Sequence, residues 1–466
     1  MTPSDRNAES QQIRPEWYYL ILSVPFGFAL LFLTPPSQVP DEFAHLMRSF
    51  QLSEGRFVAV KVGSQTGGDL PVSLTTMMSP YWGIPFHPTV KTTVASVRKS
   101  ADIPLDRDKR HFVNFPNTAM TPPLPYLPQA LGIVLASQLT SSVLYLMYAG
   151  RAFNLLATIS VTFLAIRRTP IGKWMFAVLA LTPMSMFIAA SLSADALTNA
   201  LSFLLIAQIL HVAFGPQACV TGTSILQMAL LGIAIGQCKQ AYFLLPACIL
   251  IIPIVRFGSW RRYCISFAVV MVVTCLSVVA WALVVRGIYS PANPLVEIDP
   301  GRQLQLIQTD PSRFLTALKV TIQNTPSYFQ QFAGVLGFLD TYLPDWVIYT
   351  TWAVILIACL DHLVPPGNVR LLHVSLFLGI SLVTSFIVTF IIYLTWEKVG
   401  GTTLIGIQGR YFIPLSPLIG LVIARVRELM PNSWLRHLPL LNAISISILP
   451  SLLLVTLFTL YARYYE

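Results

Sequence analysis

Long apolar stretches with almost no charged residues recur along this chain, and they restrict its fold more than any other feature. A helix needs about 20 mostly apolar residues to cross the hydrocarbon core of a bilayer. The sequence of 466 residues is 55% hydrophobic and only 11% charged, which is more apolar surface than a soluble domain hides. We therefore expect an all-α integral membrane protein. About eleven transmembrane helices are predicted, at residues 17–34, 143–166, 174–192, 196–213, 222–237, 240–255, 263–285, 346–360, 374–394, 411–424 and 438–461.

Lys and Arg residues near the span ends indicate which side faces the cytoplasm. Basic clusters at 167–173, 256–262 and 425–436 fall at one set of ends, whereas the opposite turns carry little positive charge. Cytoplasmic loops retain such residues, so we expect a cytoplasmic N-terminus. Residues 17–34 have no cleavage signal after them and are predicted to be a retained span. The net charge of +10 fits contact with membrane lipids better than binding of nucleic acid.

The chain is predicted to form one polytopic membrane domain, residues 1–466, with two long segments on the outer or periplasmic side. The first outer loop, 35–142, is expected to carry juxtamembrane helices and an acidic motif, with an irregular course over 57–121. The second, 287–345, contains a candidate amphipathic helix near 302–320. Long loops in a compact protein are usually functional, so both are candidates for covering a site.

Two carboxylates, Asp41 and Glu42, follow the first span directly and are the candidate catalytic residues. At helical spacing Asp41 shares a face with His45 and Arg48, while Glu42 points about 100° away. Asp41 is therefore the preferred general base, a group that takes a proton from an attacking hydroxyl. Capping of the helix start is an equally simple role for Asp41. Because Glu42 and His45 are three residues apart, a divalent metal ion is an alternative, and no cofactor is firmly predicted.

Three cations at or near the outer ends of spans are candidate ligands for a phosphate. Arg410 lies at the mouth of the tenth span, where a guanidinium can hold phosphate oxygens in a bidentate manner. Lys239 is a lone cation at an outer turn, and Arg151 lies within the second span. The alternatives are a lysine that extends to the membrane surface and an arginine that joins helices. Candidate substrate-binding residues are His45, Arg48, Asp195, Gln408, Tyr411, Tyr242 and Lys398.

Three motifs together resemble a family of bacterial membrane proteins of unknown function. They are residues 35–45 with Pro40-Asp41-Glu42-Phe43-Ala44-His45, residues 125–132, and Tyr393-Leu394-Thr395-Trp396 leading to Gln408-Gly409-Arg410-Tyr411-Phe412-Ile413-Pro414. That family in turn is similar to the GT-C superfamily of membrane glycosyltransferases. The resemblance implies a polyprenyl-phosphate-linked sugar donor, bound in a groove at the outer leaflet, with Asp41 as catalytic base. It also implies a location in the bacterial cytoplasmic (inner) membrane. The Trp-Trp-Asp signature of oligosaccharyltransferases does not occur in the chain.

The function expected from these features is transfer of a sugar to a cell-envelope glycan, lipid or protein acceptor, with inversion at the sugar carbon. A lipid or polysaccharide transporter or flippase is one alternative, although matched halves are not evident in the sequence. Another is a glycan polymerase or ligase that uses a lipid-pyrophosphate donor, for which Arg98, Arg107 and Arg110 would supply charge. A structural membrane subunit is the third, and the clustered outer carboxylates and cations count against it.

Overall fold

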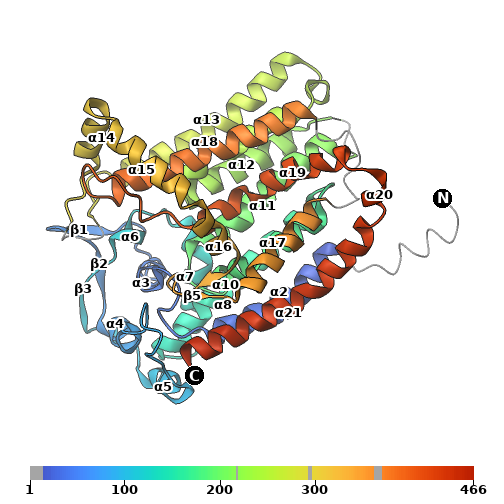
Figure 1. The fold of residues 1–466 in the computed structure, drawn as a ribbon. Helices are drawn as coiled ribbons and strands as arrows, with labels where there is room; N and C mark the ends of the chain where they lie inside the picture. The colour runs from blue at the N-terminus through green and yellow to red at the C-terminus, as the bar shows by residue number, and fades with distance from the viewer. Residues whose placement is uncertain (1–13, 217–218, 292–295, 361–369, 466) are drawn as a thin grey trace.

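A bundle of long helices forms the body of the protein, and a smaller layer of short helices and strands covers one end of it (Figure 1). The structure is a computed structural model that describes residues 14–216, 219–291, 296–360 and 370–465. Six helices in those ranges are long and apolar enough to cross a membrane. They are α2 (Pro15–Leu33), α8 (Val143–Arg168), α11 (Ala194–Phe214), α13 (Trp260–Val284), α18 (Leu371–Thr395) and α21 (Leu438–Tyr464).

Of the other five predicted spans, 222–237 and 346–360 are continuous helices of 17 and 15 residues, shorter than the six above, and the remaining three are broken, so the count of about eleven is not confirmed. Residues 174–192 divide into α9 and α10, because Pro183 cannot donate the backbone hydrogen bond that a continuous helix needs. Thr182 caps the second piece by accepting a hydrogen bond from Ser185 N. The apolar pieces are α9 (Lys173–Ala180), α10 (Pro183–Ala189), α12 (Gly222–Cys238), α17 (Asp345–Cys359) and α19 (Ser416–Val426).

One predicted span is largely replaced by 3-10 helix, in which hydrogen bonds join residues three apart and runs are short, and another begins with such a helix. Residues 240–255 fall on η4 (Gln240–Tyr242), η5 (Leu245–Ile251) and the start of η6 (Ile254–Phe257). Residues 411–424 fall on η7 (Gly409–Leu415) and α19. Pro246 and Pro414 lie within these segments, and each removes one backbone donor.

The first outer segment has more regular structure than its sequence indicates. Its residues 57–121, expected to be irregular, contain a three-stranded antiparallel sheet in the order β1-β2-β3, formed by β1 (Val60–Val62), β2 (Gln65–Pro71) and β3 (Arg110–Asn114). Gly67 pairs with Asn114, and a Cβ at Gly67 would lie 1.8 Å from Val113 O. The helices around the sheet are α3 (Glu42–Ser53), α4 (Val72–Met78), η1 (Ser79–Tyr81), α5 (Val94–Lys99), η2 (Ser100–Asp102), α6 (Pro116–Ala119), η3 (Leu124–Tyr126) and α7 (Leu127–Ala136).

The second outer segment lies against the ends of α17 and α18. The helix predicted near 302–320 is two helices that meet near Asp310 and Pro311, and Phe314 of the second packs against Phe390 and Tyr393 of α18. Residues 292–295 of this segment are outside the described ranges. Its elements are α14 (Pro300–Thr309), α15 (Ser312–Gln323), α16 (Thr325–Gly334), β4 (Val335–Leu336) and β5 (Thr341–Tyr342). The remaining elements are η8 (Arg427–Leu429) and α20 (Asn432–Leu435).

Candidate functional site

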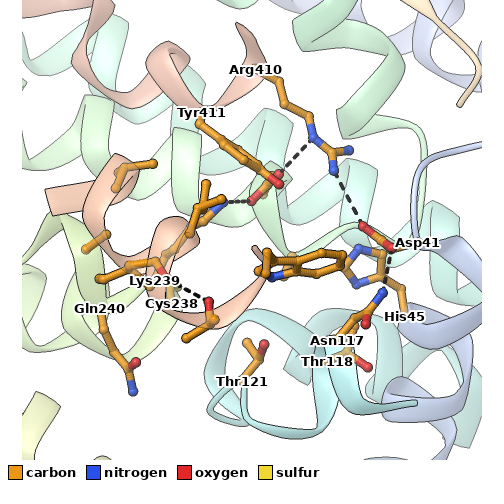
Figure 2. Close-up of a pocket in the computed structure, with 18 of the residues that line it drawn as sticks. Asp41, His45, Asn117, Thr118, Thr121, Cys238, Lys239, Gln240, Arg410 and Tyr411 are labelled. Carbon is orange, nitrogen blue, oxygen red and sulfur yellow. Dashed lines mark hydrogen bonds and ion pairs between the residues drawn. The ribbon is translucent and has the colours of Figure 1, made fainter. Parts of the chain in front are cut away.

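A polar cavity of about 230 Å³ lies where several helices of the bundle end beneath the outer layer. Four separate turns supply its charged groups: the entry to α3, the start of α11, the end of α12, and η7. Figure 2 shows these side chains converging on one space. The charged or hydrogen-bonding residues that line the cavity include Asp41, His45, Asn117, Thr121, Tyr126, Asp195, Lys239, Gln240, Trp396, Arg410 and Tyr411.

Asp41 occupies the N-cap position of α3 in an unusual backbone conformation. Its φ of 61° and ψ of 13° lie in the left-handed region, which L-residues other than Gly, Asn and Asp seldom adopt. Its side chain makes no capping hydrogen bond; instead Oδ1 accepts one of 2.9 Å from Asn117 Nδ2 on α6. The carboxylate is 30% exposed and borders the cavity. The backbone therefore directs Asp41 away from its own helix and toward the cavity.

Arg410 brings a buried guanidinium to the same cavity. Its side chain is 2% exposed, with Nη2 3.8 Å from Asp41 Oδ2 and Nε 3.4 Å from Asp195 Oδ2. Among the described residues, Nη1 and Nε have no partner with hydrogen-bond geometry. An unsatisfied buried donor is costly, and more so when it is charged. Arg410 can therefore donate to an anion that enters the cavity.

Lys239 and Asp195 form the second charged pair of the cavity. Lys239 Nζ lies 3.0 Å from Asp195 Oδ1 and 3.8 Å from the centroid of the Tyr411 ring. The Tyr411 backbone is fixed from behind, because the Tyr242 hydroxyl donates a 2.6 Å hydrogen bond to its carbonyl. Asp195 thus stands between two cations, Lys239 and Arg410, and most of the Lys239 charge is already matched.

His45 lies one turn into α3 and is neutral in the folded protein. Burial lowers its pKa to about 4, although Asp41 and Asp195 nearby act to raise it. Its Nδ1 lies 2.8 Å from the Tyr126 hydroxyl, so one of the two groups donates to the other. Burial also raises the pKa of Tyr126 well above its usual range. A neutral imidazole leaves the positive charge of the cavity to Lys239 and Arg410.

Glu42 and Arg151 are placed together, away from the residues that line this cavity. Both side chains are fully buried, with Arg151 Nε donating to Glu42 Oε1 at 2.8 Å and Nη2 to Oε2 at 2.5 Å. Arg151 also donates to the carbonyls of Leu31, Thr34 and Pro35 at the end of α2. The pair ties α8 to the exit of α2. In this arrangement neither residue reaches the position from which it would act as base or phosphate ligand.

Four other candidate residues also lie outside the cavity lining, among them Tyr242, which contacts the Tyr411 backbone. Arg48 is buried and donates to Gln51 Oε1 and to the carbonyls of Phe57 and Thr121, so it supports the first outer segment. Gln408 accepts from Tyr411 N through its carbonyl, which helps to start η7. Lys398 is exposed in the loop after α18.

The structure adds residues that sequence reasoning did not single out as site residues. Asn117 and Thr121 come from the segment expected to be irregular, where nothing in the pattern distinguished them. Trp396 belongs to one of the three motifs and Gln240 follows Lys239 directly, but the sequence pattern assigned no role to either side chain. For the metal alternative, no group of three or more His, Cys, Asp and Glu side chains is found in the described part of the chain. Glu42, one of the two proposed ligands, is instead bound to Arg151.

A second cavity, of about 700 Å³ and almost entirely apolar, borders the other side of η7. Residues from α16, α17, α18 and α19 line it, and Phe412 and Leu415 of η7 contribute directly. Leu356 and Leu382, also in the lining, are 46% and 68% exposed, so this cavity reaches the apolar surface of the bundle between α17 and α18. One 3-10 segment therefore contributes Arg410 to the polar cavity and Phe412 to the apolar one.

A family model described as "Predicted membrane protein (DUF2142)" matches residues 25–419, most of the chain. The family resemblance indicated by the three motifs is confirmed by this match. No curated protein matches the sequence. Among solved structures, ArnT from Cupriavidus metallidurans in the apo state aligns over 96% of this chain and 75% of its own, with 12% identity and a TM-score of 0.37. A TM-score below 0.5 does not establish a common fold.

Proposed function

This chain belongs to the DUF2142 family of predicted membrane proteins, and we propose that it is a membrane glycosyltransferase. The proposed reaction moves a sugar from a polyprenyl-phosphate-linked donor to a cell-envelope glycan, lipid or protein acceptor at the outer face of the cytoplasmic membrane. One observation carries the proposal: the Asp41 carboxylate and the buried Arg410 guanidinium face one cavity, 3.8 Å apart, at the end of a membrane bundle.

The arrangement of cations favours a donor with a single phosphate. Lys239 is already paired with Asp195 at 3.0 Å, whereas Arg410 has an Nη1 donor without a partner among the described residues. One guanidinium with a free Nη1 donor suits a single phosphate group. A lipid diphosphate would bring a second charge, and Arg110, one of the arginines considered for it, is bound to Glu54 in the outer layer.

The apolar cavity supports a lipid carrier for that phosphate. Its lining is continuous with the apolar surface between α17 and α18 and ends at η7, two residues along from Arg410. Transfer of a hydrocarbon chain from water into this cavity would gain about 0.8 kcal/mol for each CH₂ group. Transfer from the bilayer would gain little, because lipid tails are already apolar. The cavity would therefore act mainly by positioning a chain that arrives from the outer leaflet.

In the proposed mechanism Asp41 removes the proton from an acceptor hydroxyl as its oxygen attacks the anomeric carbon of the sugar. The bond from that carbon to the phosphate oxygen breaks, the configuration inverts, and the lipid phosphate leaves with the bonding electrons. Arg410 stabilises the charge that develops on the phosphate, and Asn117 keeps one oxygen of Asp41 engaged so that the other faces the substrate.

Turnover of a lipid-linked donor tests the proposal. The protein in lipid nanodiscs would be offered radiolabelled polyprenyl-phosphate sugars with membrane extract as acceptor source. We expect Asp41→Asn to reduce turnover by about 10²- to 10⁴-fold, and Arg410→Gln by about 10²- to 10³-fold. Asp345→Asn and Arg302→Gln, at exposed outer positions, serve as matched controls and should keep wild-type rates.

Two results would contradict this function. Equal donor consumption by wild type and Asp41→Asn would remove the proposed base from the reaction. Movement of a labelled donor across the bilayer without any consumption would replace the transferase with a lipid transporter, the main alternative.

A further inference from the structure

Trp396 presents an exposed indole to the polar cavity at the end of α18. It is 42% exposed although it lines the cavity, and no hydrogen bond to its indole N–H is found in the described ranges. The loop that follows packs against the Trp396 side chain, since a Cβ on Gly406 would lie 3.6 Å from Trp396 Cβ. This loop is held in place by Glu397, whose Oε1 accepts a 2.5 Å hydrogen bond from Ile405 N. The ring is therefore a supported aromatic surface at the cavity, beside the apolar side chains of Val388, Ile391 and Ile392.

Uncharged polar groups lie on the side of the cavity away from Arg410. Figure 2 shows Arg410 and Tyr411 along one edge of the space, with Gln240 and Thr121 toward the opposite edge and Asn117 beside Asp41. The Gln240 side chain makes no hydrogen bond to another described residue, so its amide can both donate and accept. An aromatic face with a few amide and hydroxyl groups around it suits a sugar ring, whose C–H face is apolar and whose rim carries hydroxyls.

The charges already present leave no place for a charged sugar. Asp195 is matched by Lys239 and Arg410, and Arg410 also faces Asp41. The donor phosphate would engage the free donor of Arg410, and the acceptor hydroxyl would engage Asp41. A uronic acid would add a further negative charge beside Asp41, Asp195 and the donor phosphate, which is unfavourable. The ammonium group of an amino sugar would have to compete with Lys239 and Arg410 for carboxylates that these cations already face.

We propose that the polar cavity binds the transferred sugar as one neutral monosaccharide, stacked on Trp396, with its hydroxyls recognised by Gln240 and Thr121. This inference rests on the proposed transferase function and adds the class of sugar to it. The volume of about 230 Å³ equals that of about seven or eight waters at ~30 Å³ each, and lies below the range of about 300–1,000 Å³ for sites that take larger ligands. A single ring matches this volume better than a disaccharide does.

Three donors that share one polyprenyl phosphate and carry a neutral hexose, a hexuronic acid or an amino sugar test the inference. We expect the neutral donor to have the highest kcat/KM by at least about tenfold. Trp396→Leu should raise KM for it by about 5- to 10-fold, whereas Trp396→Phe should change KM less than about threefold, because a ring is retained. Trp346→Leu removes an indole of similar exposure on α17, outside the cavity, and should leave KM unchanged.

Inhibition by polyprenyl phosphate without a sugar separates sugar binding from a structural role. If Trp396 contacts the sugar, Trp396→Leu leaves the inhibition constant of the sugar-free lipid within about twofold while the donor KM rises. The inference would be overturned if Trp396→Leu weakened the donor and the sugar-free lipid equally, if the donor KM stayed unchanged, or if a charged donor were preferred. Each of these results would leave the transferase function standing. If the wild type consumes no donor at all, the proposed function fails and the inference fails with it.

Discussion

The fully buried pair of Glu42 and Arg151 gives a prediction that separates a structural from a chemical role for both residues. In Arg151→Met the Glu42 carboxylate keeps one long contact, a 3.4 Å approach from Leu192 N, and loses two hydrogen bonds to the guanidinium. Removal of one partner from a buried ion pair costs about 3–5 kcal/mol, because the remaining charge is not compensated. The three carbonyls at the end of α2 lose their donor as well.

A thermal unfolding assay in nanodiscs measures this cost. At about 2 °C for each kcal/mol, the value for larger domains, Arg151→Met should lower the apparent Tm by roughly 6–10 °C. Glu42→Gln should act in the same direction. The double variant, in which no charge is left uncompensated, should recover part of the loss, with a coupling energy of about 0.5–3 kcal/mol. Arg302→Met serves as control, because its pair with Glu297 is more than half exposed and contributes little.

The alternative is that Arg151 binds the donor phosphate or that Glu42 is the base, as their sequence positions suggested. The reasoning from the structure would be refuted if Arg151→Met kept the wild-type Tm and lost donor binding. It would equally be refuted if Glu42→Gln unfolded normally but lost turnover to the extent expected of Asp41→Asn.

Two further predictions concern the cavity itself. Asn117→Ala removes the 2.9 Å hydrogen bond to Asp41 and should lower kcat roughly 10- to 100-fold with the donor KM unchanged, as a steady-state titration of donor would show; a raised KM with normal kcat would contradict a positioning role. Burial holds the pKa of His45 at about 4, against about 6.5 in the unfolded chain. The unfolded state therefore binds more protons between these values, and stability falls as the pH is lowered from 6.5 toward 4. Over this pH range the free energy of unfolding should fall by up to roughly 3 kcal/mol less in His45→Gln than in the wild type. Parallel Tm profiles of the two proteins over the same range would contradict this prediction.

The turns that build the site could be predicted from sequence because each follows from a local signal. Asp41, Asp195, Lys239 and Arg410 are polar residues at the ends of apolar stretches, and the pattern of basic residues placed those ends on one side. The structure brings all four to one cavity. Their mutual distances depend on how helices pack, and they could not be obtained from one sequence.

Asp41 lines the cavity and Glu42 pairs with Arg151 because of a backbone geometry that the sequence pattern does not reveal. A helix starting at Pro40 would put Asp41 on a face with His45 and Arg48, but the helix starts at Glu42 and Asp41 has φ of 61°. Asp41 still borders the cavity, but it does so through its left-handed backbone conformation and not through a helix face shared with His45 and Arg48. Arg151 was correctly placed within a long helix, but its direction is set by a partner more than a hundred residues away.

The small sheet and the breaks in the shorter helices were missed for different reasons. The strands of the sheet contain three to seven residues with mixed polarity, and Gly67 and Gly68 in β2 weaken any alternation of apolar and polar residues. Residues 174–192 are mostly apolar and carry no charge, and hydrophobicity alone does not show that Pro183 starts a new helix. Composition therefore predicted the class of fold but not the count of spans.

The position of η7 between the two cavities has a kinetic consequence. A donor whose lipid chain lies beside Phe412 and whose phosphate lies at Arg410 would occupy both sides of one backbone segment, while Asp41 on the far wall stays 30% exposed. The acceptor then has its own approach, and both substrates can be present before any bond is broken. Initial-rate plots should accordingly show intersecting lines, the pattern of a ternary complex, and the used carrier can return sideways to the bilayer without passing the new product.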